Sequence, residues 1–187
     1  MKENIIGREQ EIEKLENYIS SRKSEFIAIY GRRRVGKTFL VKELFENRFA
    51  FRITGKDNVS TKEQLASFSF ALNDQLGIET DAANWPEAFR LLQKALEKMP
   101  EGIKIIFFDE LPWFDTYASH FVSALEHFWN DWASYRNDIK LIACGSATTW
   151  MLNQVINSRG GLHNRITHNI LLSPFKLHEV EEYFRTQ

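Results

Sequence analysis

The most informative stretch of this 187-residue chain is an apolar run followed at once by a basic loop with a glycine at each end. It reads Phe26-Ile27-Ala28-Ile29-Tyr30 and then Gly31-Arg32-Arg33-Arg34-Val35-Gly36-Lys37-Thr38-Phe39. The loop fits the pattern G-x-x-x-x-G-K-[ST], which has a mechanism when it joins a buried strand to the start of a helix. Both neighbours are predicted here, because the apolar run is typical of a strand and residues 39–45 are typical of a helix. The stretch therefore predicts a phosphate-binding loop over 31–39.

The residue types in this loop suit phosphate. Gly31 and Gly36 allow the backbone to curl, so that several amide N–H groups point inward. The helix that begins at the end of the loop adds the positive end of its dipole. We expect Lys37 to neutralise the β- and γ-phosphates of ATP, and Thr38 to offer its hydroxyl to Mg²⁺. The alternative is a glycine turn that carries a solvated arginine run.

A second buried strand ends in two acidic residues. Ile105-Ile106-Phe107-Phe108 is followed directly by Asp109 and Glu110. We expect Asp109 to hold the Mg²⁺ that Thr38 coordinates. Glu110 points elsewhere, because it comes one residue later, and we expect it to polarise the attacking water. A solvated strand end is the alternative, since acids at strand ends are common, but the phosphate loop strengthens the functional interpretation.

Ser146 follows a third apolar strand, which ends in Ala143-Cys144-Gly145. In a parallel sheet of order 5-1-4-3-2, this strand lies between the two that carry the loop and the acids. Ser146 would then be within reach of the γ-phosphate or the attacking water. The alternative is an N-cap for a helix over Ala147–Ile156, and both roles can hold. We expect Cys144 to be buried in the core.

Apolar runs and amphipathic stretches alternate along the chain. The runs lie at 26–30, 49–51, 103–108, 139–144 and 170–172. The run at 103–108 is broken only by Lys104 and the run at 139–144 only by Lys140. Such short runs are typical of parallel strands that are covered on both faces. Apolar residues at helical spacing lie between them, such as Leu65 and Phe68. Capping signals mark helix starts at Ser60 and Asn84, and Gly77 is a candidate helix end.

These patterns predict one α/β domain over 1–187, a three-layer sandwich around a parallel five-stranded sheet of order 5-1-4-3-2. We expect a mobile loop over 155–167, which is rich in Gly, Ser and Asn, and a final helix near 177–185. The chain stops at Gln187 without C-terminal punctuation. We therefore expect a further domain to follow, and the alternative is that the protein ends on a frayed helix.

Composition excludes several classes of protein. Hydrophobic residues make up 43% and charged residues 26%, which argues against disorder or a coiled coil for the bulk of the chain. The formal net charge of -1 argues against a nucleic-acid binder that works through its whole surface. A single cysteine excludes a disulfide framework. No apolar run approaches the ~20 residues needed to cross a bilayer, so we expect a soluble, cytoplasmic protein without membrane contact.

Two groups of conspicuous residues have two interpretations each. Of the loop residues Arg32, Arg33 and Arg34, either Arg32 and Arg34 face solvent or pair with helix acids, or at least one of the three contacts phosphate or a partner. Trp113 and Phe114, close to Glu110, are buried or else meet a partner at the active edge. We expect the later tryptophans, Trp129 and Trp132, to pack in the core.

These motifs resemble those of AAA+ ATPases, and more specifically those of archaeal and bacterial ATPases allied to the STAND class of signalling NTPases. The stretch 30–38 is close to that family's usual Walker A loop, and Phe108-Asp109-Glu110 resembles its Walker B motif. Gly145-Ser146 matches its sensor-1 position. The resemblance covers about Ile5 to Phe184. It implies that the predicted sandwich is of the P-loop NTPase type.

Three further segments enter through the resemblance. Ile6-Gly7-Arg8-Glu9 resembles the N-terminal box of the family, which implies that Gly7 and Arg8 contact adenine. Leu172-Ser173-Pro174-Phe175 followed by Glu179 resembles its strand-five exit. Arg165 stands where such proteins keep an arginine for the γ-phosphate. The family usually has glycine before that arginine, whereas Asn164 stands here, so Arg159 is a rival.

The family usually continues into a winged-helix or lid region, and we expect that region to be absent from residues 1–187. The resemblance implies that without a lid nucleotide binds weakly and hydrolysis is slow.

Motifs and resemblance together predict a Mg²⁺-dependent ATPase that acts as a nucleotide-driven switch. The expected catalytic residues are Glu110, Lys37, Ser146 and Arg165. Expected partners are ATP and ADP, a DNA or protein partner engaged through a C-terminal domain, and a neighbouring subunit in a homo-oligomer. One alternative is a small-molecule P-loop kinase, against which the paired acids argue. The other is a non-hydrolysing, ATP-gated module that binds DNA or protein.

Overall fold

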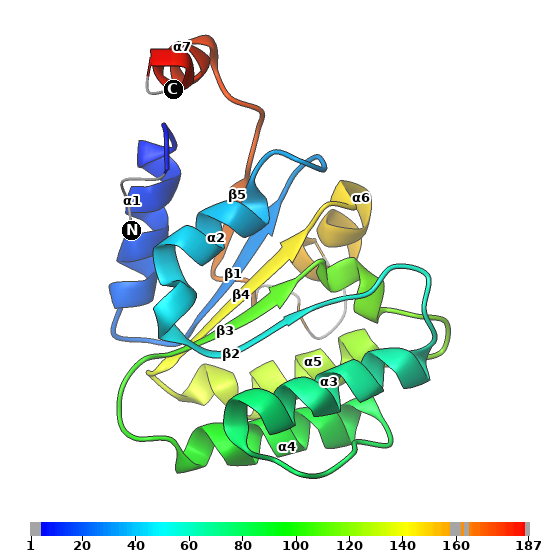
Figure 1. The fold of residues 1–187 in the computed structure, drawn as a ribbon. Helices are drawn as coiled ribbons and strands as arrows, with labels where there is room; N and C mark the ends of the chain where they lie inside the picture. Colours follow the sequence, from blue (N-terminus) through cyan, green and yellow to red (C-terminus); the bar gives the residue numbers. More distant parts are fainter. Residues whose placement is uncertain (1–4, 158–161, 163–164, 186–187) are drawn as a thin grey trace.

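Five parallel strands form a single sheet in the order β2-β3-β4-β1-β5 in the computed structural model, which describes residues 5–157, 162 and 165–185 (Figure 1). The strands are β1 (Glu25–Tyr30), β2 (Phe49–Thr54), β3 (Lys104–Asp109), β4 (Ile139–Gly145) and β5 (His168–Leu171). Each paired strand runs parallel to its neighbour. The predicted α/β class, strand number and strand order are confirmed.

Helices cover both faces of this sheet, so the domain has three layers (Figure 1). On one face lie α1 (Glu9–Ser20) and α2 (Lys37–Phe45), and on the other lie α3 (Thr61–Leu76), α4 (Trp85–Lys98) and α5 (Phe121–Asp131). The last helix, α7 (Leu177–Arg185), lies beyond the carboxyl ends of the strands, at the end of the sheet where β1 meets α2.

The apolar runs are continuous because alternate side chains enter two separate cores. In β1, Phe26 and Ala28 belong to the core under α3–α5, whereas Ile27 and Ile29 belong to the core under α1 and α2. All four side chains are fully buried. A strand that is covered on both faces has no polar side to show, which is why its sequence shows no alternation.

Aromatic side chains dominate the core under α3–α5. The ring of Phe108 has aromatic neighbours at centroid distances of 5.7 to 6.4 Å, namely Phe51, Phe68, Phe89, Phe114 and Phe121. Trp129 is 2% exposed and Trp132 packs against the same cluster, as expected. Phe114 is also fully buried, which decides between its two interpretations. This cluster fixes the end of β3, from which both predicted acids extend.

The predicted helix signals are confirmed where they can be compared. Ser60 accepts a hydrogen bond from the backbone of Glu63, and the carboxylate of Glu63 accepts one from the backbone of Ser60. Asn84 accepts from the backbone of Glu87 before α4. Gly77 ends α3 with a left-handed φ of 66°, which glycine adopts without steric cost.

The segment after β4 differs from its prediction. The expected helix over Ala147–Ile156 is a short α6 (Thr148–Trp150) that continues as the π-helical η5 (Met151–Ile156). The residue before α6 is Ala147, and Ser146 makes no capping hydrogen bond there. Residues 158–161, 163 and 164 of the predicted loop lie outside the described part of the chain.

Short 3-10 segments join several elements: η2 (Glu46–Arg48), η3 (Leu111–Phe114) and η4 (Ala133–Tyr135). Among the described residues, no helix combines the length and the apolar character that crossing a bilayer requires.

Candidate functional site

The phosphate loop lies between the end of β1 and the first turn of α2. Gly31 has a φ of 147°, and a Cβ atom there would lie 2.3 Å from the carbonyl oxygen of Leu172, so only glycine fits against the exit of β5. Gly36 has a φ of 91° and precedes α2 directly. The loop therefore turns into the helix N-terminus, as its sequence predicts.

Lys37 lies inside the curve of this loop. Its Nζ donates hydrogen bonds to the carbonyl oxygens of Gly31 at 3.0 Å and Arg32 at 2.9 Å, and the residue is only 5% exposed. The buried ammonium group is thus held at the mouth of the loop by neutral oxygens. Phosphate oxygens, which carry charge, are stronger acceptors for the same group.

Thr38 and Asp109 meet across the sheet edge. The Thr38 hydroxyl lies 3.0 Å from one carboxylate oxygen of Asp109 and 2.9 Å from the other, although 71 residues separate them in sequence. Asp109 is 4% exposed, and this burial raises its pKa above the ordinary value, while the hydrogen bond from Thr38 opposes the shift. A hydroxyl and a carboxylate are hard oxygen ligands of the kind that Mg²⁺ prefers, so the two residues fit that ion.

Glu110 turns away from Asp109 and meets Ser146. Its Oε2 accepts a hydrogen bond from the Ser146 hydroxyl at 2.8 Å and another from the Ser146 backbone N–H at 3.2 Å. Glu110 has a φ of 47°, an uncommon left-handed conformation for a residue other than glycine. The N-cap interpretation of Ser146 is therefore wrong, because the Ser146 hydroxyl is committed to the second acid.

Two further residues, absent from the sequence prediction, shape the backbone around Glu110: Gly55 lies against Glu110 itself, and Gln64 joins the segments that follow β2 and β3. A Cβ atom on Gly55 would lie 2.7 Å from the carbonyl oxygen of Glu110, so glycine permits this close approach. Gln64 is fully buried and donates to the carbonyl oxygens of Lys56 and Trp113. The signal for Gln64 was a polar residue one turn before Phe68 on the apolar face of α3.

A pocket of about 360 Å³ adjoins the phosphate loop. Its lining is largely apolar and comes from the N-terminal box, the loop, α2, the exit of β5 and α7, and it includes Ile6, Val35, Phe39, Phe175 and Tyr183. Arg8 also lines it and donates to the carbonyl oxygen of Val35 at 3.3 Å. The N-terminal box and the loop are thus adjacent, in a pocket large enough for a flat ring system.

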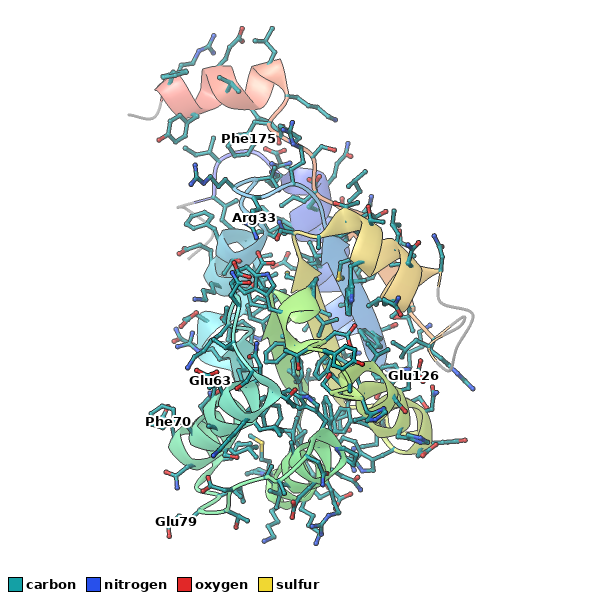
Figure 2. The ribbon with its side chains drawn as sticks, turned by 90° about the vertical axis from the view of Figure 1, so that its right-hand side faces the viewer. Arg33, Glu63, Phe70, Glu79, Glu126 and Phe175 are labelled. Carbon is teal, nitrogen blue, oxygen red and sulfur yellow. The ribbon has the colours of Figure 1, made fainter. Side chains whose placement is uncertain are left out.

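The arginines of the loop lie at its surface, and Arg34 also lines the pocket. Arg32, Arg33 and Arg34 are exposed, and the guanidinium of Arg33 lies 5.8 Å from the ring centroid of half-buried Trp113. Figure 2 shows Arg33 and Phe175 toward the same end of the molecule, with Phe70 and Glu79 at the other.

Arg165 is the one predicted site residue in the described part of the chain that lies far from the loop. It precedes β5, and nearby Thr167 donates its N–H to the carbonyl oxygen of Phe26 at the start of β1. The loop follows the opposite end of β1, roughly 16 Å away along the strand. Arg165 is exposed at this second edge. Its rival Arg159 lies outside the described residues.

The sequence profile of a family described as an ATPase domain predominantly from Archaea matches residues 5–186. The chain belongs to this archaeal ATPase family. The description of this family and the loop geometry agree, so this is an ATP-binding P-loop ATPase domain.

Two relatives from Methanocaldococcus jannaschii are similar in sequence. An uncharacterised protein is 29% identical over 183 residues, which is 96% of this chain and 38% of that protein. An uncharacterised ATP-binding protein is 46% identical over 44 residues, or 24% of this chain and 75% of the relative. The ATPase domain described here thus spans well under half of the longer relative.

Solved structures share the fold. A Walker-type ATPase of Pyrococcus abyssi has a TM-score of 0.70 at 22% identity, over 98% of this chain and 58% of that one. Cdc6p from Pyrobaculum aerophilum has a TM-score of 0.67 at 16% identity, over 97% and 50%. A chain of Drosophila ORC, solved bound to DNA, has a TM-score of 0.57 at 14% identity, over 92% and 94%.

Proposed function

We propose that this ATPase domain hydrolyses ATP with Mg²⁺ and acts as a nucleotide-driven switch. The observation that supports this best is the separation of two adjacent acids. Asp109 contacts the hydroxyl of Thr38, and Glu110 contacts Ser146. One acid is thus available for a metal ion and the other for water, which is the division of labour that ATP hydrolysis needs.

Thr38 and Asp109 would hold Mg²⁺, and Lys37 and the loop amides would hold the phosphates. The ion supplies charge neutralisation on the β- and γ-phosphate oxygens when it is bound. The residues of the chain do the rest by positioning and by electrostatic stabilisation, because phosphoryl transfer leaves little covalent work for a protein.

In the proposed reaction, water attacks the γ-phosphorus of ATP. A bond forms between the water oxygen and phosphorus, the bond from phosphorus to the bridging oxygen of ADP breaks, and the water protons leave with phosphate and solvent. Glu110 orients the water by accepting one of its hydrogen bonds. Ser146, which already donates to Glu110, stabilises charge near the γ-phosphate.

Arg165 would complete the site of a second copy. Arg165 lies at the amino ends of the strands, and the phosphate loop of its own chain lies at their carboxyl ends. A contact between this arginine and a γ-phosphate therefore requires another subunit. This proposal makes the active form a homo-oligomer in which each site takes one arginine from its neighbour.

The output of the switch would lie in parts of longer family members. This chain spans 38% of one M. jannaschii relative and 58% of the P. abyssi ATPase, so such proteins are long enough to contain the lid, winged-helix or partner-binding region that this proposal requires. A net charge of -1 gives this domain no strong attraction of its own for DNA. We therefore propose that a DNA or protein partner is engaged through such a region.

One coupled assay separates the three candidate functions. The protein is incubated with Mg²⁺–ATP, with and without small-molecule acceptors, and both free phosphate and phosphorylated acceptor are measured. Phosphate release to water supports the ATPase, whereas a phosphorylated acceptor would replace it with a kinase. Background release, together with a melting temperature that rises with ATP, would replace it with a non-hydrolysing binding module.

A further inference from the structure

A buried carboxylate connects α7 to the N-terminal box. Glu179, in the first turn of α7, is 5% exposed. Its Oε1 accepts a hydrogen bond from the backbone N–H of Arg8 at 3.1 Å, and its Oε2 accepts one from the backbone N–H of Lys176 at 2.6 Å. Arg8 precedes α1 and Lys176 precedes α7. One carboxylate therefore serves the starts of two helices, whose dipoles both favour a negative charge there.

Gly7 makes this contact possible. It has a φ of +67°, and a Cβ atom built on it would lie 2.9 Å from both Cγ and Oε1 of Glu179. A side chain at position 7 would be strained by its backbone conformation and would also push the carboxylate away. The structure therefore requires glycine at position 7 of the N-terminal box, whether or not this residue contacts the base.

Arg8 extends the effect of Glu179 to the nucleotide pocket. Its backbone is left-handed, with a φ of 66°, which costs free energy in a residue other than glycine. Its guanidinium donates to the carbonyl oxygens of Ser173 at 2.7 Å and Val35 at 3.3 Å, and lies 4.5 Å from the ring centroid of Phe175. Val35 and Phe175 both line the 360 Å³ pocket. The position of Arg8 therefore determines how two walls of the pocket meet.

We propose that Glu179 is a positioning residue for the base end of the bound nucleotide. Its carboxylate fixes the backbone of Arg8, and Arg8 holds the phosphate loop and the β5 exit together around the pocket. This inference rests on the proposed function only in taking ATP as the ligand of the loop. The hydrogen bonds that hold Lys37 in the loop involve neither Glu179 nor Arg8. We therefore expect the loss of Glu179 to act mainly on the base and much less on the phosphates.

The test compares two ligands of the same loop, ATP and inorganic tripolyphosphate, by direct titration of Glu179→Ala. We expect the affinity for ATP to fall about tenfold, the size typical of a lost hydrogen bond to a charged group. The affinity for tripolyphosphate, which has no base, should stay within about twofold of wild type. Glu181→Ala, which changes an exposed acid of the same helix, should bind both ligands as wild type does.

Gly7→Ala disturbs the same contact from the opposite side and should reproduce the selective loss of ATP affinity. If Glu179→Ala does not fold, the same two titrations of Gly7→Ala test the proposal. A folded variant that loses affinity for both ligands equally, or for neither, would overturn the proposal, since it would show a merely structural role or none. Wild-type protein that binds neither ligand would overturn the proposed function itself, and this inference with it.

Discussion

Asp109 and Glu110 are neighbours in the chain, yet they contact different partners because the backbone changes from an extended to a left-handed conformation between them. Asp109 still belongs to β3 and points to Thr38, whereas the left-handed φ of 47° at Glu110 directs the next side chain to Ser146. Held in a sparsely populated conformation by its surroundings, Glu110 is the kind of strained residue that clusters at functional sites.

Glu110→Gln should preserve nucleotide binding and slow hydrolysis by at least ~10²-fold, the cost of losing one key transition-state interaction. The amide keeps the shape of the side chain but removes the charge that orients water. Phosphate release under saturating Mg²⁺–ATP measures the effect, and Glu101→Gln, an exposed position, serves as the control. Turnover at the wild-type rate would remove Glu110 from the mechanism.

Asp109→Asn should raise the melting temperature of the nucleotide-free protein at neutral pH. Burial raises the native pKa of Asp109, so between its ordinary value and that raised value the native state binds more protons than the unfolded chain. Stability is therefore lost as the pH rises through this window, and the asparagine variant escapes the loss.

The advantage of the asparagine variant should shrink as the pH falls toward the ordinary carboxyl pKa of 3.8. Melting curves at several pH values, with Asp74→Asn as an exposed control, measure it. A variant less stable than wild type at every pH would show that the carboxylate is no burden to the fold. The same variant should gain less stability than wild type from Mg²⁺–ATP.

At the residue scale, the sequence predicts the parts of the site that have fixed chemical patterns. Thr38 and Asp109 were expected to share an ion and do lie in contact. Ser146 was expected to reach the γ-phosphate or the attacking water, and it contacts Glu110, the acid expected to polarise that water. Glu179 contacts Arg8, which is 171 positions away in the sequence, and Gln64 contacts Trp113, which is 49 positions away. No local pattern specifies such partners, so only the fold reveals them.

At the scale of the elements, β3 packs through Phe108, whose ring is surrounded by other aromatic rings. Phe108→Ala should lower the free energy of unfolding by about 3–5 kcal/mol, since a buried ring leaves a large cavity. Urea denaturation measures the loss, and Phe70→Ala, at a position 73% exposed, should cost far less. Equal effects of the two substitutions would contradict the described packing.

Strands were more predictable than the helix after β4. Runs that are apolar at nearly every position arise when both faces are covered, and this condition holds for β1, β3 and β4. The exceptions within the runs are Lys104 and Lys140, whose ammonium groups are hydrogen-bonded. The segment after Ser146 looks helical by composition, but the contact with Glu110 removes Ser146 from the cap. The helix begins later, at Thr148, and continues with π geometry, which often marks functional sites.

At the scale of the whole molecule, the phosphate loop lies at the carboxyl ends of the strands and Arg165 lies at their amino ends. If Arg165 acts on a second copy, Arg165→Ala and Lys37→Ala should each be inactive alone. An equimolar mixture should recover part of the activity, because a Lys37→Ala subunit still offers its arginine to an Arg165→Ala site. Phosphate release from the mixture measures this, and activity no higher than the sum of the two variants alone would contradict the homo-oligomer.

The central claim is that the loop amides and the Lys37 ammonium bind the triphosphate of ATP. The most direct test is a calorimetric titration of Lys37→Ala with Mg²⁺–ATP, beside wild type and the exposed control Lys14→Ala. We predict binding by wild type and control, and no measurable binding by Lys37→Ala. An ATP affinity of Lys37→Ala equal to that of wild type would show that the nucleotide binds elsewhere.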